Sequence, residues 1–469
     1  MRSFLHLLLL FALAAGLSAC TPAARIPGTI HKSLIAAKNA VLPSSRRKSK
    51  PAVAPPLRYA AHTATLYVTF GLQVAGVAPL PGDFEPDMSR APLWLDGGRE
   101  VAVIGTRAGK GVMLGFSGGG LSGRRVVIED DGAGALRGRL LDIATSADGR
   151  ILATAVASDS TNRLDVNLAD TSSPGGVQPI ASLEGEFESA QLAWMGSGHI
   201  ALFAQAVTPA SDELTTQTAA VPVSGLYLIT LGPDASIRRL DAVKCPLSLL
   251  AFSPNDGFAV AQGAGSATPA LVDVHNGSCT KFPSRDPLQI IGWAPNSGAF
   301  LYRRGDQGGV FRFDLPTGHS STIAIASGAA AFASDGTIIA FGSQELSWRR
   351  AVAVPTAPVK AQIALFDPHQ NLITINSLGF ATLPALMAQS TMVFSQVSND
   401  AIIDTAMPGS TELVRELIEY SYPARAAFIL ARGAVRGPIA ISWSPDGKQI
   451  AIVDGDATRR TLAVITPPK

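Results

Sequence analysis

Short runs of β-prone residues, separated by turn-forming residues, recur along most of the chain. The clearest unit lies near the C-terminus, where residues 439–443 and 449–453 flank the turn Ser444-Pro445-Asp446-Gly447. Proline presets φ at the first corner of a type I turn, aspartate bonds the backbone beyond it, and glycine accepts a positive φ. Two β-rich segments joined in this way predict a β-hairpin.

Weaker copies of this strand–turn–strand unit precede it at spacings of about 38 to 60 residues, the range expected for a four-stranded blade with variable loops. The copies begin at Trp94, Thr145, Trp194, Phe252, Trp293 and Phe332, with a degenerate one at Met387. The pattern predicts an all-β protein, a β-propeller of eight four-stranded blades, with seven blades as the alternative.

The turn at 444–447 and its copies resemble the TolB-type Pro-Asp propeller repeat, a relative of the WD-repeat class. The resemblance spans roughly residues 90–455, and only the copy at 443–453 is close to the family pattern. It implies a closed ring of blades. The last unit is short of strands, so we expect residues 65–70 to complete it, because ring closure removes exposed strand edges.

One segment, residues 411–422, fits two descriptions. Leu413, Val414, Leu417 and Ile418 have helical spacing, whereas Val414, Ile418, Tyr420 and Tyr422 suit one face of a strand. Both interpretations stay open.

The N-terminus has the features of an export signal: a positive charge at Arg2, an apolar run over residues 4–16, and small residues before Cys20. The run is shorter than the ~20 apolar residues that span a membrane. Leu17-Ser18-Ala19-Cys20 resembles the bacterial lipobox. The resemblance implies that residues 1–19 are removed, that Cys20 is lipidated, and that Thr21, in place of an aspartate, directs the protein to the outer membrane.

Residues 20–58 are predicted to form a flexible linker, because they are rich in proline, alanine and serine, and residues 59–469 to form the propeller. The net charge of +2 indicates no nucleic-acid partner. After lipidation of Cys20, Cys245 and Cys279 remain in an oxidising compartment, either as a disulfide or as two free buried thiols.

Motifs for chemistry give no catalytic set. Residues 115–119 match the nucleophile-elbow pattern, but they link two predicted strands, whereas that motif acts at a strand-to-helix turn. The histidines are scattered singly, without the spacing of metal ligands. We therefore expect no cofactor and no metal.

Two long excursions interrupt the repeat, residues 207–222 and 343–360. The second contains Trp348, Arg349 and Arg350, and tryptophan and arginine are the residues most enriched in interface hot spots. We therefore expect a membrane-anchored, non-catalytic scaffold that binds another envelope protein, from the periplasm or the cell surface. A propeller hydrolase or lyase acting on envelope polysaccharide or peptide, and a sensor of small ligands or glycans, stay open as alternatives.

Overall fold

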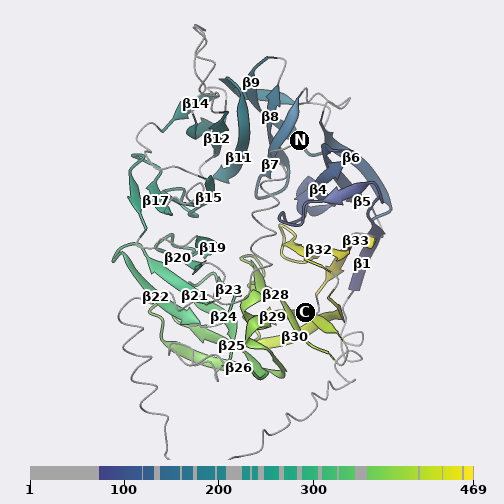
Figure 1. The fold of residues 1–469 in the computed structure, drawn as a ribbon, viewed down its shortest axis with the longest axis vertical. Helices are drawn as coiled ribbons and strands as arrows, with labels where there is room; N and C mark the ends of the chain where they lie inside the picture. Colours follow the sequence, from purple (N-terminus) through teal and green to yellow (C-terminus); the bar gives the residue numbers. More distant parts are fainter. Residues whose placement is uncertain are drawn as a thin grey trace, which may run out of the picture.

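The computed structural model describes residues 73–467, apart from residues 119, 131–137, 159–160, 173–176, 196–197, 208–223, 233–234, 241–247, 263–268, 283–287, 305–308, 325–326, 344–355, 410–411, 436 and 457–458. Its strands form eight antiparallel sheets arranged in a ring (Figure 1). The protein is an eight-bladed β-propeller. This confirms the predicted fold class and decides for eight blades over seven.

Each blade runs outward from an inner strand. Blade 1 consists of β2 (Phe84–Pro86), β3 (Leu93–Leu95), β4 (Glu100–Arg107), β5 (Lys110–Ser117) and β6 (Gly123–Glu129), and blade 2 of β7 (Arg139–Thr145), β8 (Ile151–Ser158), β9 (Arg163–Asp170) and β10 (Gln178–Glu184). Blade 3 consists of β11 (Phe187–Met195), β12 (His199–Ala206), β13 (Gly225–Thr230) and β14 (Ser236–Arg239), and blade 4 of β15 (Ser248–Phe252), β16 (Phe258–Gln262), β17 (Ala270–Asp273) and β18 (Cys279–Lys281). Blade 5 consists of β19 (Leu288–Trp293), β20 (Ala299–Arg304), β21 (Val310–Asp314) and β22 (His319–Ala324), and blade 6 of β23 (Ala330–Phe332), β24 (Ile338–Gly342), β25 (Val359–Phe366) and β26 (Leu372–Thr382). Blade 7 consists of β27 (Thr391–Ser395), β28 (Asp400–Pro408), β29 (Leu413–Ser421) and β30 (Ala426–Ala434), and blade 8 of β31 (Ala440–Trp443), β32 (Ile450–Asp456), β33 (Arg459–Thr466) and β1 (Gln73–Pro79).

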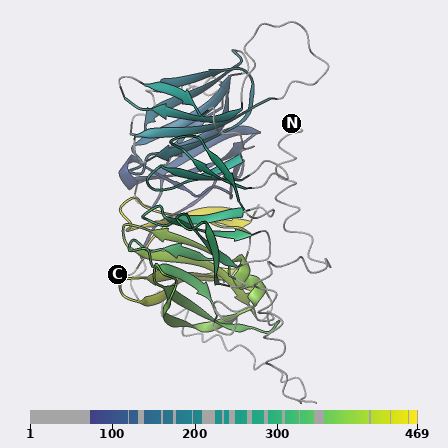
Figure 2. The same ribbon diagram turned by 90° about the vertical axis from the view of Figure 1, so that its left-hand side faces the viewer.

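The antiparallel order gives the ring two different faces. We call the end that carries the first-to-second and third-to-fourth strand turns of each blade, such as 444–447, the turn face. The opposite end, the loop face, carries the second-to-third connections and the connections between blades. The short helix α4 (Pro384–Gln389), which leads from blade 6 to blade 7, lies at the loop face (Figure 2). Both long excursions found in the sequence also begin and end there, after β12 and after β24.

The predicted hairpin turns are present at the turn face. In the last blade the N–H of Gly447 donates to the carbonyl oxygen of Ser444 at 2.9 Å, and Gly447 has φ of 67°. Blades 4 and 5 place side chains at this left-handed position, namely Asp256 and Ser297, whereas the turn of blade 7 is one residue longer and closes with a bond from the N–H of Asn399 to the carbonyl oxygen of Ser395 at 2.9 Å. Apart from blade 7, the turn geometry of these blades is therefore more regular than its sequence.

The core lies between the blades. Buried apolar side chains form eight clusters, and each cluster is shared by two consecutive blades. Because the middle strands are covered on both faces, they are apolar on both faces and alternate weakly. Packing between blades, and not only pairing within them, therefore holds the ring together.

Four of the five tryptophans occupy one repeated position near the end of the inner strand: Trp94, Trp194, Trp293 and Trp443. The indole N–H of Trp293 donates to the carbonyl oxygen of Ala251 at 3.1 Å, and that of Trp443 donates to Val393 at 3.1 Å. Each of these bonds reaches the inner strand of the preceding blade. The repeat thus accounts for every tryptophan except Trp348.

An N-terminal strand closes the ring, as expected, but it is not the one predicted. The outermost strand of blade 8 is β1, which pairs with β33 from Gln73 opposite Thr466 to Pro79 opposite Thr461. Residues 65–70, which we expected in this place, lie outside the described residues. The sequence pattern could not choose between two nearby β-prone segments.

Two further expectations are settled by the structure. Residues 413–421 form the strand β29, not a helix. The degenerate repeat that we placed at Met387 is wrong, because residues 384–389 form α4. The inner strand of blade 7 is β27, and its turn covers residues 396–399.

Candidate binding site

The inner strand of blade 1 is interrupted. β2 pairs with residues 105–107 of β4 and β3 pairs with residues 100–102, so residues 87–92 leave the sheet between them. Pro86 directly precedes this segment and Pro92 is its last residue. Proline lacks the N–H that a strand ladder needs. Within it, Asp87 accepts the N–H of Ser89 at 3.0 Å and its hydroxyl at 2.6 Å. We call residues 87–92 the strap.

A cavity of about 170 Å³ lies between the strap and the inner strands of blades 7 and 8. It is lined by Met88, Ser89, Arg90, Ala91, Thr391, Val393, Ile439, Ala440 and Ile441. Thr391 begins β27 and Ala440 begins β31, so the cavity lies toward the loop face. We call it the axial pocket.

The size of the axial pocket limits what it can hold. Small-molecule sites in proteins usually measure about 300–1,000 Å³. The axial pocket, at about 170 Å³, corresponds to roughly five or six water molecules in the liquid. Six of its nine lining residues are apolar, while Ser89, Arg90 and Thr391 are polar, and the accessible wall is polar and apolar in about equal parts. Its size therefore suits a single side chain better than a cofactor or a sugar chain.

Arg90 links the strap to the next two blades. Its Nη2 contacts Asp142 Oδ1 on β7, the inner strand of blade 2. The other oxygen of Asp142 accepts the backbone N–H of Leu192, on β11 in blade 3, at 2.6 Å. Asp142 is 5% exposed; burial raises the pKa of its carboxyl, and the positive charge of Arg90 opposes that rise. One carboxylate therefore joins the strap and two neighbouring blades.

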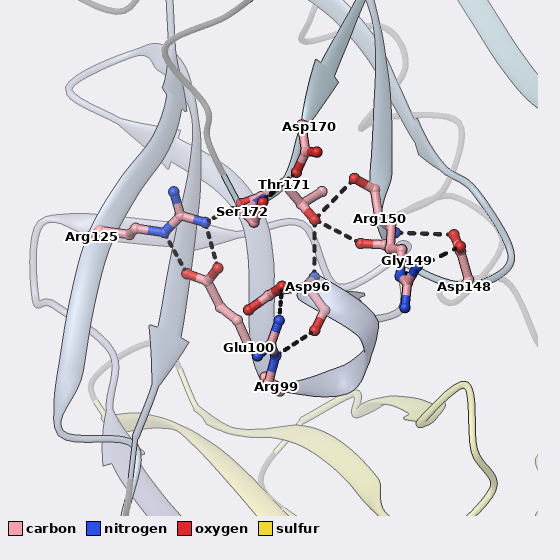
Figure 3. Close-up of polar contacts among 10 residues, drawn as sticks. All are labelled: Asp96, Arg99, Glu100, Arg125, Asp148, Gly149, Arg150, Asp170, Thr171 and Ser172. Atoms are coloured by element: carbon pink, nitrogen blue, oxygen red, sulfur yellow. Dashed lines mark hydrogen bonds and ion pairs between the residues drawn. The ribbon is translucent and has the colours of Figure 1, made fainter.

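A second polar cluster joins blades 1 and 2 at the turn face (Figure 3). The buried carboxylate of Glu100 accepts hydrogen bonds from Arg125 on β6, with Nε 2.7 Å from Oε1 and Nη2 2.5 Å from Oε2. Arg125 also donates to the carbonyl oxygen of Thr171 at 2.8 Å, and the hydroxyl of Thr171 donates to Gly149 at 2.9 Å. The hydrogen bond to Glu100 raises the pKa of Arg125. These bonds fasten one blade to the next.

The same cluster explains the nucleophile-elbow pattern at residues 115–119. A Cβ atom at Gly115 would collide with the Glu100 carboxylate, so glycine is needed there to admit that side chain. Ser117 ends β5, and the chain returns in β6 as an antiparallel neighbour. The segment therefore lies in a strand-to-strand connection, as we expected, and not at a strand-to-helix turn.

Most of the site residues predicted from the sequence cannot be placed. Cys20, Cys245, Trp348, Arg349 and Arg350 lie outside the described residues. Cys279 begins β18 and is disulfide-bonded. Its pairing with Cys245 stays a prediction.

No three His, Cys, Asp or Glu side chains converge as metal ligands within the described part of the chain. Over the same residues, no helix is both long enough and apolar enough to cross a membrane.

No protein-family model and no curated protein matches the chain. Many solved structures resemble it at low identity, and three of them illustrate the range. An oligogalacturonate lyase from Vibrio parahaemolyticus is 9% identical, with a TM-score of 0.45, over 85% of this chain and 98% of that one. Prolyl oligopeptidase B from Galerina marginata is 13% identical, with a TM-score of 0.44, over 84% and 57%. TolB from Acinetobacter baumannii is 13% identical, with a TM-score of 0.30, over 78% and 64%.

This chain thus spans little more than half of the peptidase and less than two thirds of TolB. The three neighbours differ in function, and likeness at this level of identity concerns the fold alone.

The sequence patterns did not point to the strap or to Asp142. The available signal was the pair Pro86 and Pro92, which brackets five residues shortly before the first repeat, at Trp94. That signal shows where a strand breaks. It does not show that Arg90 reaches a second blade.

Proposed function

We propose that the protein is a membrane-anchored envelope lipoprotein whose propeller is a non-catalytic scaffold that binds a partner protein at its loop face. The observation that carries the proposal is the axial pocket, which offers both apolar and polar contacts, is sized for one side chain, and is placed toward the loop face. A protein that offers one anchoring side chain matches such a pocket, because buried anchors in small pockets dominate protein–protein binding energy.

The direction of the chain supports the choice of face. β32 begins at the turn face with Ile450, and its partner there is Ile465, near the end of β33. The residue after Ile465, Thr466, pairs with Gln73, the first residue of β1. β1 therefore starts at the turn face, where the first described residue, Gln73, lies. The axial pocket and α4 lie at the opposite face, where the strands that flank both long excursions also end and begin. An anchor on the linker leaves that face available to a partner.

Cys20→Ala is expected to abolish lipidation, because only the thiol forms the thioether to diacylglycerol. Metabolic labelling with an alkyne fatty acid in the native cell measures this directly. Equal labelling of the variant and the wild type would refute the anchor without bearing on the propeller.

Site-specific photocrosslinking tests partner binding. A photoreactive residue at Thr391, at the rim of the axial pocket, is expected to capture one defined protein in living cells. The matched control is Lys448, whose side chain is 63% exposed on the turn face. No capture at Thr391, or the same products from both positions, would contradict the proposed face. Capture of a glycan or small metabolite would favour the sensor or enzyme alternatives.

Trp348→Ala is expected to weaken partner binding by about 2 kcal/mol or more without lowering the melting temperature. The reason is that the other four tryptophans fill a repeated position of the blades, whereas Trp348 falls outside that repeat. A quantitative pulldown and a thermal melt on the same variant measure both effects. If the variant loses both its fold and its binding, Trp348 has a structural role. If binding is unchanged, Trp348 is not part of the interface.

A further inference from the structure

The strap is the one inner segment of the described blades that leaves its sheet between two strands of the same ladder. Its local bonds are short-range: the N–H of Arg90 donates to the carbonyl oxygen of Asp87 at 3.1 Å, and Arg90 Nε lies 3.5 Å from Asp87 Oδ2. The N–H of Asp87 is bonded to Ile104 of β4 at 2.9 Å. These contacts shape the strap as a turn but tie only its first residue to its own blade.

The contact to Asp142 is of another kind. It joins residues far apart in sequence and in different blades, and the carboxylate is almost fully buried while the Arg90 side chain is 34% exposed. A buried carboxylate without its counter-charge is costly, so the arrangement favours the strap position in which Arg90 faces Asp142. The hydrogen bond from Leu192 fixes the other oxygen and so orients the carboxylate toward the strap.

The strap also supplies four of the nine residues that line the axial pocket, including Met88, whose flexible thioether adapts to different shapes. The remaining wall comes from regular inner strands of blades 7 and 8. One side of the pocket is therefore held by the sheets, and the other by the strap.

We propose that Arg90 and Asp142 form a catch that holds the strap as a movable wall of the axial pocket, and that the partner binds only when the catch is closed. Arg90 is in this sense a positioning residue, since it acts by keeping residues 88–91 in place. The inference rests on the proposed function for the role of the pocket, but the catch itself can be measured without a partner.

Two variants open the catch in different ways. Arg90→Met keeps the length of the side chain and removes its charge. Asp142→Asn keeps an oxygen for the Leu192 N–H and removes the negative charge. The matched control is Arg99→Met, because Arg99 is 78% exposed and its ion pair, to Asp96 at 2.6 Å, is local and lies on the turn face. All three changes are made in the full chain, with a thermal melt to verify folding.

The first measurement is amide hydrogen exchange over residues 87–92. Both catch variants are expected to exchange there at least about tenfold faster than the wild type, because opening of this segment is no longer opposed. Arg99→Met is expected to leave that rate unchanged. Wild-type exchange in both catch variants would overturn the inference, whatever the partner does.

The second measurement is photocapture from Thr391 in the same variants. Reduced capture in both catch variants, and full capture in Arg99→Met, is the expected result. Fast exchange with undiminished capture would show that the strap is not a wall the partner needs. Absence of capture even in the wild type would count against the proposed function, while the exchange rates would still decide whether the catch exists.

Discussion

Glu419→Gln is expected to stabilise the protein by about 3 kcal/mol at pH 7, an unusual sign for a change at a buried position. Glu419 lies on β29 opposite Ile402 and Phe428, and it is 3% exposed. Its Oε2 has no hydrogen-bond partner among the described residues. Burial, and to a smaller extent the negative charge of Asp400, raise the pKa of Glu419 to about 8. Glutamine has nearly the same shape and never needs to hold the proton.

The effect should depend on pH in a defined window. Below the ordinary pKa of 4.5, Glu419 is protonated in both the folded and the unfolded chain, and the two proteins should differ little. As the pH rises, the unfolded chain loses this proton while the folded chain keeps it, so the wild type loses stability relative to the variant. The loss should level off above about pH 8, where the folded carboxyl also ionises. Denaturant unfolding at several pH values measures the divergence.

Glu100→Gln provides the opposite case. Glu100 is also buried, but both of its carboxylate oxygens are bound by Arg125. Removing the negative charge weakens two charge-assisted bonds, so we expect a loss of about 2 kcal/mol in the free energy of unfolding. Two buried glutamates should thus respond to one substitution with opposite signs. A similar change in stability for both variants would contradict the environment assigned to Glu419.

The sequence was sufficient to predict the propeller because its turns recur. Ser444-Pro445-Asp446-Gly447 identifies the repeat, and aromatic residues such as Trp293 and Phe332 mark the ends of the inner strands. Even the blade number followed, although the eighth unit was placed at Met387 in error. There the blade-to-blade connection contains α4, and the true turn ends at Asn399, without proline or glycine.

Residues 413–421 show why the strand was hard to recognise. In β29, Ile418 and Tyr420 face blade 6, whereas Leu417 faces blade 8. A strand covered on both sides carries apolar residues on both faces, so its pattern lacks the period of two and imitates a helix. The ambiguity was a consequence of burial between two blades.

The candidate site was less accessible to sequence reasoning for a different reason. Arg90, Asp142 and Thr391 are separated by 52 and 249 positions along the chain, and only the ring brings their strands together on the axial side. None of the three stands in a recognisable motif. A site assembled from several blades leaves no local spacing to detect, whereas a turn repeat does.

Gly447→Val is expected to destabilise the protein by about 3 kcal/mol or more, and Lys448→Val by no more than about 0.5 kcal/mol. Gly447 has φ of 67°, where a β-branched residue is strained. A Cβ atom there would also lie 3.0 Å from Ser395 Oγ and 3.0 Å from the backbone nitrogen of Ser398, in the turn of blade 7. Lys448 instead points into solvent and loses only a surface ion pair with Asp446.

Gly447→Asn separates the two causes of this loss. Asparagine tolerates the left-handed conformation and occupies it at Asn399, where φ is 57°. Its Cβ would still press on Ser395 and Ser398, so we expect Gly447→Asn to fall between the wild type and Gly447→Val. Thermal melts of the three variants give the order. Equal melting temperatures for Gly447→Val and Lys448→Val would contradict both the turn and the contact between blades 7 and 8. A Gly447→Asn variant as damaged as Gly447→Val would assign the loss to that contact alone.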